Sequence, residues 1–158
     1  MAVFSMENPV FVTYVIAATL MVLKLMGQGW MTVFRMIRSD AGLLNPEDLR
    51  EGPANRNPRP AQLEPNEYVE RSRRIQRNDL ESIPAFLACG LLFVAVQPPL
   101  RLTQVLMYTF VAARLGHTLA YATAQRHELR ATLFSVGSLV VIVMAIYTLV
   151  VALSYPMG

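Results

Sequence analysis

The chain alternates long apolar runs with polar connections. Apolar residues dominate about 10–35, 78–96, 100–121 and 129–153. Each run reaches or nearly reaches the roughly 20 residues that an α-helix needs to cross the hydrocarbon core of a bilayer. The pattern predicts an all-α fold, an integral membrane four-helix bundle with four spans, in which residues 1–158 form a single domain.

The longest polar connection covers about 39–65 and is broken by several prolines, so we expect an aqueous loop rather than a second domain. Within it, Asn-Pro-Glu-Asp at 45–48 has the cap, proline and acids of a helix start and predicts one short helix. Glu-Pro-Asn-Glu at 64–67 opens the long second helix, in which Pro84 predicts a kink. Gln-Pro-Pro at 97–99 predicts a tight turn into the third.

The second helix begins with the charge-dense segment VERSRRIQRNDLE, residues 69–81. Arg74, Arg77, Asn78 and Glu81 fall at i, i+3, i+4 and i+7 and therefore share one helix face. A charge at membrane depth costs about 2.5–3.5 kcal/mol on insertion scales. The face therefore predicts polar partners, a water-filled cavity or a polar ligand.

A second polar face lies on the third helix, where Arg114, His117 and Tyr121 fall at i, i+3 and i+7. Arg130 stands in the opening turn of the fourth helix. Basic residues concentrate on the first and third connections, so we expect those connections in the cytoplasm and both termini on the opposite side. Both polar faces then converge on the cytoplasmic side.

Lys24 interrupts the first apolar run near its middle. This position favours an internal acidic partner over a side chain that snorkels to the interface, with Asp79 or Glu81 as candidates. Arg71 and Arg73 lie off the polar face, and we interpret them as solvated or facing lipid headgroups.

Composition adds to this picture. Hydrophobic residues make up 54% of the chain, which excludes an ordinary soluble domain. Of the 14 basic residues all but Lys24 are arginine, a bias that suits bidentate recognition of carboxylates but that a GC-rich genome also produces. Cys89 is the sole cysteine, so a disulfide framework or zinc cluster is excluded, and we expect no metal ion.

A face with arginines, an asparagine and a carboxylate can hold a small zwitterion that carries two carboxylates and one ammonium group, such as glutathione. A thiol with a pKa near 8.5 is only a few per cent ionised at pH 7. Lowering that pKa by about two units requires roughly 2.7 kcal/mol of preference for the thiolate. Arg130, near a helix N-terminus, is placed to supply it.

These motifs resemble the MAPEG family of trimeric four-helix membrane proteins of eicosanoid and glutathione metabolism. The resemblance rests on residues 69–81, on Asn-Pro-Glu-Asp at 45–48 and on Ala-Arg-Leu-Gly-His-Thr-Leu-Ala-Tyr at 113–121. It implies a homotrimer, surrounded by lipids, with glutathione as co-substrate between subunits at the cytoplasmic helix ends. The implied catalytic residue is Arg130. The implied glutathione contacts are Arg74, Arg77, Asn78, Glu81, Arg114, His117 and Tyr121, with Arg35 or Arg38 from a neighbouring subunit.

Departures from the family pattern separate its branches. The prostaglandin E synthase type has a serine directly after the arginine that matches Arg130 and a tyrosine three residues further on, whereas this chain has Ala131 and Phe134. In this respect it resembles the microsomal glutathione transferase branch. Two other departures are Gln76, where relatives carry histidine, and Pro84, one position earlier than the family's proline.

Three functions follow from the resemblance. The foremost is a membrane-bound glutathione transferase that conjugates glutathione to apolar electrophiles from the bilayer, with glutathione-dependent peroxidase activity as an extension. The second is a glutathione-dependent prostaglandin or lipid-peroxide isomerase. The third is a non-catalytic lipid-binding scaffold. A bacterial inner membrane and the endoplasmic reticulum are both compatible with the sequence.

Overall fold

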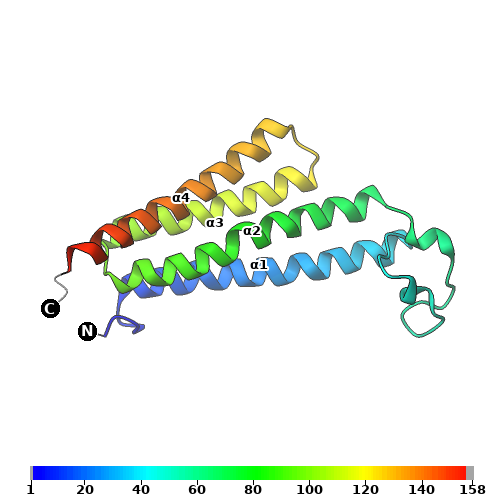
Figure 1. Cartoon of the computed structure of the whole chain (residues 1–158), viewed down its shortest axis with the longest axis horizontal. Coiled ribbons are helices and arrows are strands. Elements are labelled where there is room, and N and C mark those ends of the chain that lie inside the picture. Colours follow the sequence, from blue (N-terminus) through cyan, green and yellow to red (C-terminus); the bar gives the residue numbers. More distant parts are fainter. Residues whose placement is uncertain (1, 156–158) are drawn as a thin grey trace. The chain divides into compact units, whose positions relative to one another are not determined.

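The structure, a computed structural model, describes residues 2–155, and within them it is entirely helical, without a strand. The long helices are α1 (Pro9–Ser39), α2 (Glu67–Ala95), α3 (Leu100–Ala122) and α4 (His127–Ser154), and two 3-10 turns, η1 (Pro46–Leu49) and η2 (Pro60–Leu63), lie between α1 and α2 (Figure 1). The predicted all-α fold is therefore confirmed.

Local capping explains where α1 and α2 begin. The side-chain oxygen of Asn8 accepts a hydrogen bond from the backbone N–H of Val10 at 3.0 Å, and that of Asn66 accepts one from Tyr68 at 3.0 Å. The short helix predicted at 45–48 is η1, while η2 was not predicted. α2 continues without a break through Pro84.

Three segments are long and apolar enough to cross a membrane: Pro9–Ser39, Pro60–Ala95 and His127–Ser154. They make the chain an integral membrane protein. α3, the fourth predicted span, is not among them, because Arg101, Arg114 and His117 lower its hydropathy. Its 23 residues still match the length of a span.

The chain divides into two compact units. The α3–α4 unit contains the residues up to Leu25 and from Asp79 onward, and the loop unit contains Met26–Asn78. α1 and α2 are each divided between the two units. The single domain predicted for the whole chain stays a prediction.

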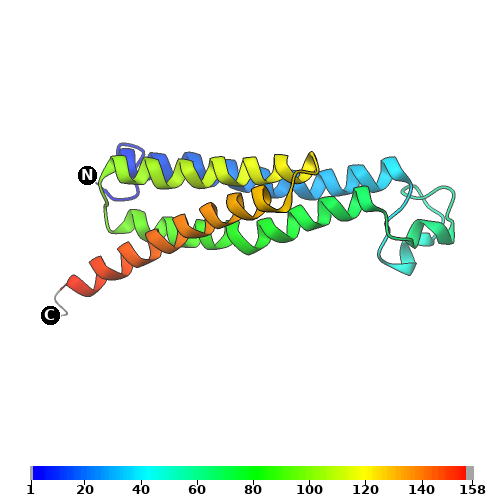
Figure 2. The same cartoon turned by 90° about the horizontal axis from the view of Figure 1, so that it is seen from above.

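In the α3–α4 unit, α3 and α4 run antiparallel and are joined by a short turn (Figure 2). The core of this unit includes the stacked rings of Phe86 and Phe110, whose centroids lie 4.0 Å apart. Tyr14 donates a hydrogen bond to the carbonyl of Leu87 at 2.9 Å. A Cβ atom at Gly90 would lie 3.0 Å from the Tyr14 ring, so a larger residue at this close approach of α1 to α2 would push the ring aside by a few tenths of an ångström.

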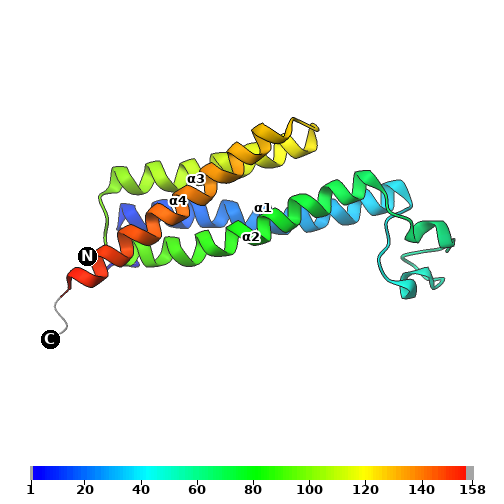
Figure 3. The same ribbon diagram turned by 45° about the horizontal axis from the view of Figure 1, so that its top comes forward.

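In the loop unit, the polar connection folds back to the start of α2 (Figure 3). Buried Gln62 organises it: its carbonyl accepts from the Leu43 N–H at 2.8 Å, its amide donates to Asp40 at 2.5 Å, and Asn55 donates to its side-chain oxygen at 2.8 Å. Gly42 has φ +78°, and Val69 methyl carbons lie within 3.2 Å of where a Cβ would be. Only glycine fits there.

Candidate functional site

A buried charge cluster joins three helices of the α3–α4 unit. Lys24 Nζ lies 2.5 Å from Asp79 Oδ2, and Arg114 Nη2 lies 2.7 Å from Asp79 Oδ1. The side chains of Asp79 and Arg114 are fully buried, and that of Lys24 is 8% exposed. The predicted acidic partner of Lys24 is thus confirmed as Asp79. Glu81, the other candidate, is exposed.

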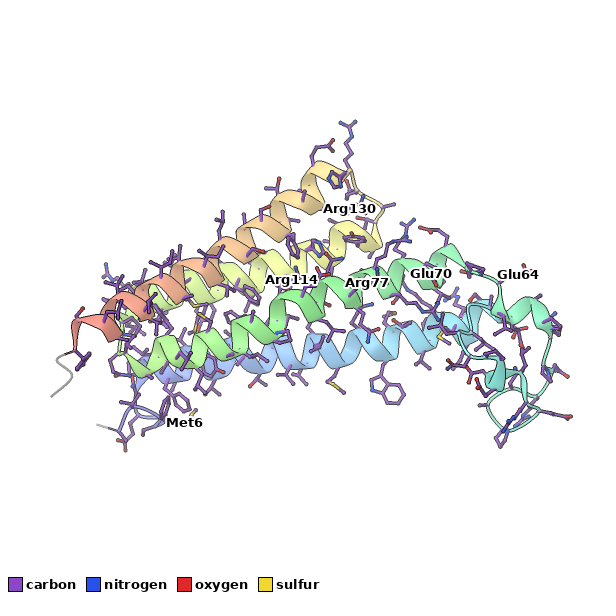
Figure 4. All side chains as sticks on the ribbon, in the orientation of Figure 1. Met6, Glu64, Glu70, Arg77, Arg114 and Arg130 are labelled. Carbon is purple, nitrogen blue, oxygen red and sulfur yellow. The ribbon has the colours of Figure 1, made fainter. Side chains whose placement is uncertain are left out.

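An aromatic and cationic cluster lies on α3 and α4, next to Arg114. The guanidinium carbon of Arg130 lies 4.5 Å from the Tyr121 ring centroid, and that of Arg114 lies 5.7 Å from the Phe134 ring. The His117 ring lies 4.9 Å from Tyr121 and 6.0 Å from Phe134. We call Arg114, His117, Tyr121, Arg130 and Phe134 the α3–α4 cluster. Figure 4 labels Arg114 on α3 and Arg130 in the first turn of α4.

Several buried polar atoms of this cluster lack a hydrogen-bond partner among residues 2–155. They are Nε and Nη1 of Arg114, Nδ1 of His117 and Nε of Arg130. Leaving a buried polar group unpaired costs about 1–3 kcal/mol, so such atoms rarely gather on neighbouring side chains. Guanidinium nitrogens only donate, and the group that suits them best is an anion. The arrangement can therefore bind a carboxylate or stabilise a thiolate.

The predicted site residues of the loop unit are arranged differently. Arg35 is buried and donates to the backbone carbonyl of Tyr68 at 3.0 Å. Its guanidinium carbon lies 4.4 Å from the centroid of the Tyr68 ring. Arg74 pairs with Glu67 at 2.5 Å, and Asn78 donates to the Arg74 carbonyl at 2.6 Å. Two further predicted residues, Arg38 and Arg77, are exposed.

Arg73, which we interpreted as solvated or facing lipid headgroups, is instead largely covered within the loop unit. Its side chain is 17% exposed, and its guanidinium donates to the Glu70 carboxylate and to the Gly42 carbonyl. Arg73 therefore ties α2 to the connection that follows α1. Its neighbour Arg71 is 28% exposed and lies 3.5 Å from Glu67.

Sequence reasoning also missed a buried polar contact between α1 and α2 within the loop unit. Gln28 donates to the Ser72 hydroxyl at 2.7 Å, and Thr32 donates to the same oxygen at 2.9 Å. The spacing of Lys24, Gln28, Thr32 and Arg35 at i, i+4, i+8 and i+11 was the available signal, because it places them on one face of α1.

A groove of about 640 Å³ opens in the loop unit. Its apolar wall comes from α1, with Trp30, Val33 and Met36, and its polar side includes Arg73 and Gln76 from α2. Gln76, one of the departures from the family pattern, thus belongs to this groove, and its amide nitrogen would lie 3.8 Å from a Cβ at Gly29.

The structure thus gathers part of the predicted site and leaves the rest a prediction. It brings Arg114, His117, Tyr121 and Arg130 together, all in the α3–α4 unit. Their roles as glutathione contacts, and the catalytic role of Arg130, stay predictions. The same holds for Glu81 and for the residues of the loop unit.

Comparison with known proteins identifies related sequences over most of the chain. The MAPEG family matches residues 14–150. Microsomal glutathione S-transferase 1 of Homo sapiens is 36% identical over 141 residues, and that of Rattus norvegicus is 35% identical over 140 residues; each match covers 89% of both chains. Prostaglandin E synthase of Homo sapiens is 30% identical over 135 residues, which cover 85% of this chain and 84% of the synthase.

Proposed function

Because the chain belongs to the MAPEG family, we propose that it is a membrane-bound glutathione transferase that conjugates glutathione to apolar electrophiles. The observation that carries this proposal is the set of buried, unpartnered guanidinium and imidazole nitrogens of Arg114, His117 and Arg130 among the described residues. The guanidinium donors suit an anionic co-substrate, and the related transferases are named for their use of glutathione.

The chemical step requires a thiolate. Arg130 lies in the first turn of α4, where the helix N-terminus adds partial positive charge. A desolvated guanidinium at this point stabilises the thiolate and lowers the pKa of the glutathione thiol. The thiolate sulfur then forms a bond to the electrophilic carbon, the leaving group departs with its electron pair, and the thiol proton passes to solvent.

The remainder of glutathione needs anchors for its carboxylates and its ammonium group. In the proposal, Arg74, Arg77 and Asn78 bind the carboxylate end, and Glu81 binds the ammonium group. The exposure of Arg77 and Glu81 in the isolated chain is compatible with ligand contact. Arg35 or Arg38 completes the site from a neighbouring subunit of a homotrimer, with the site on the cytoplasmic side.

The relationship to prostaglandin E synthase supports a second candidate, a glutathione-dependent isomerase or peroxidase acting on lipid peroxides. It would use the same thiolate on an oxygen centre. Ala131 and Phe134 provide no hydroxyl near Arg130, and the Phe134 ring lies against Arg114 and His117. These features favour the transferase over the isomerase.

Conjugation of glutathione to a chlorinated nitroaromatic, followed by absorbance, tests the proposal. We expect saturable turnover by the purified protein in detergent or lipid, together with thiolate absorbance of bound glutathione. A protein that neither conjugates glutathione nor reduces lipid peroxides at any glutathione concentration would contradict the enzyme proposal and favour the lipid-binding scaffold.

A further inference from the structure

The buried charge cluster carries one positive charge more than it can neutralise. Lys24 and Arg114 flank the single carboxylate of Asp79, with one cation on each oxygen. A simple ion pair of Asp79 with Arg114 would be neutral. The addition of Lys24 leaves an excess of one positive charge in a part of the unit that is almost fully shielded from solvent.

No other carboxylate of the α3–α4 unit balances this charge within the described residues. The side-chain carboxylates of this unit are those of Glu7, Asp79, Glu81 and Glu128, and of these only Asp79 is buried. An uncompensated charge is costly at a buried or membrane-embedded position. A stable arrangement therefore calls for an anion from outside the unit.

Arg114 belongs both to the buried charge cluster and to the α3–α4 cluster, so the excess positive charge lies next to the unpaired nitrogens of the α3–α4 cluster. Its Nη2 is bound to Asp79, whereas its Nε and Nη1 are buried and lack a partner among the described residues. Its guanidinium lies against Phe134, which in turn contacts His117. The charged and titratable groups around this point are Lys24 from α1, Asp79 from α2, Arg114, His117 and Tyr121 from α3, and Arg130 from α4.

We propose that Lys24 is a positioning residue: by neutralising Asp79 it leaves the charge of Arg114 to an anionic group of the bound co-substrate. This inference rests on the proposed use of glutathione. Either the thiolate or a carboxylate of glutathione could be the anion that pairs with Arg114. S-methylglutathione distinguishes the two cases, because it retains the carboxylates and lacks an ionisable thiol.

The first test compares Lys24→Met with the unmodified protein. Methionine has a similar length and leaves a neutral Asp79–Arg114 pair. At an effective dielectric of about 20, removal of one unit charge from this cluster should have roughly a tenfold effect on an anion bound beside Arg114. If the thiolate occupies the cluster, the thiolate pKa of bound glutathione rises by about one unit and S-methylglutathione affinity is unchanged. If a carboxylate occupies it, both ligands bind about tenfold more weakly.

Two variants serve as matched controls. Lys24→Arg keeps the charge and should behave as the unmodified protein. Arg101→Met removes one positive charge from an exposed position in the first turn of α3, 13 residues and about 20 Å before Arg114, and should change neither ligand.

A double variant distinguishes charge from structure. Lys24→Met/Asp79→Asn returns the cluster to an excess of one positive charge, now on Arg114 alone. We expect it to recover most of the affinity or thiolate stabilisation that Lys24→Met loses, which loss of packing would not produce. The double variant is preferred to Asp79→Asn alone, because the single variant would bury two unpaired cations and could prevent folding.

Two results overturn the inference. One is a folded Lys24→Met protein with unchanged thiolate pKa and unchanged affinity for both ligands. The other is a folded double variant no better than Lys24→Met. Failure of the proposed function gives a different result, because the unmodified protein itself would then bind neither glutathione nor S-methylglutathione, and the inference would fall with it.

Discussion

Arg73 of the loop unit and the arginines of the α3–α4 unit differ in what their guanidinium groups bind. The guanidinium of Arg73 donates to the Glu70 carboxylate and to the Gly42 carbonyl, both in the loop unit. In the α3–α4 unit, Arg114 and Arg130 have buried nitrogens without a partner among the described residues. Arg73 stabilises the fold, whereas Arg114 and Arg130 are suited to hold a ligand.

The difference teaches that residue type does not by itself identify a ligand-binding arginine. Arg73 and Arg74 are adjacent in the chain, and both form ion pairs with acids of the first turn of α2. What separates Arg73 is its contact with the Gly42 carbonyl, which lies 31 residues earlier. A side chain that closes such a long loop has a structural role whatever its charge.

The largest effect should come from Arg130→Ala, which removes the proposed thiolate stabiliser. Removing one preorganised donor to a developing or bound anion typically costs about 10²–10³-fold in kcat. We expect turnover at pH 6.5 to fall by that order while glutathione affinity changes little. Conjugation assays measure turnover, glutathione titration measures affinity, and the thiolate absorbance of bound glutathione measures stabilisation of the thiolate. Intact thiolate absorbance in the variant would show that another residue stabilises the sulfur.

Two arginines of α2, Arg73 and Arg77, allow structural and ligand-binding roles to be compared within one helix. Arg73→Ala removes charged hydrogen bonds to Glu70 and Gly42 and should lower the free energy of unfolding by about 1–2 kcal/mol. Arg77 is exposed, so its replacement should change stability by less than about 0.5 kcal/mol.

Arg77→Ala should instead weaken glutathione binding, and Glu81→Gln should act in the same direction. Thermal unfolding in detergent and glutathione titration of each variant provide the measurements. If Arg73→Ala weakened binding without loss of stability, the division between structural and ligand-binding arginines on α2 would not hold.

The smallest effect should come from Asp40 in the connection. Hydrogen bonds from Gln62 and then Arg59 hold the pKa of this carboxyl below its ordinary value of 3.8. Because the folded-state pKa is lowered, the stabilisation is present above the ordinary value and is lost as the pH falls through the folded-state value.

Asp40→Asn should therefore reduce stability slightly at neutral pH. The difference from the unmodified protein should shrink as the pH falls below the ordinary value of 3.8 and disappear below the folded-state pKa. Thermal unfolding at a series of pH values checks this. A stability difference that persisted or grew at low pH would assign the effect to packing rather than to the charge of Asp40.

Much of this architecture was predictable because it depends on local rules. Hydropathy located the four helices, and Asn-Pro-Glu-Asp at 45–48 located η1. The mid-span position of Lys24 required an acid, which the structure identifies as Asp79. The spacing of Arg114, His117 and Tyr121 placed them on one face, and His117 and Tyr121 indeed lie in ring contact.

Long-range contacts were beyond such rules. The connection contains few apolar residues, so nothing in its pattern indicated that Gln62 is buried and bonded to Asp40 and Asn55. Likewise, the sequence placed Arg73 off the polar face but did not reveal the Gly42 carbonyl that it binds.

The sequence by itself determined that this chain is a helical membrane protein of the MAPEG type, because hydropathy runs and motifs are properties of neighbouring residues. Only the tertiary structure decided which charges neutralise one another. Asp79 takes both Lys24 and Arg114, since three helices bring them within hydrogen-bond distance, and one positive charge is left over. Ion pairing depends on distances in space and on burial, which residues separated by 35 or more positions acquire only on folding.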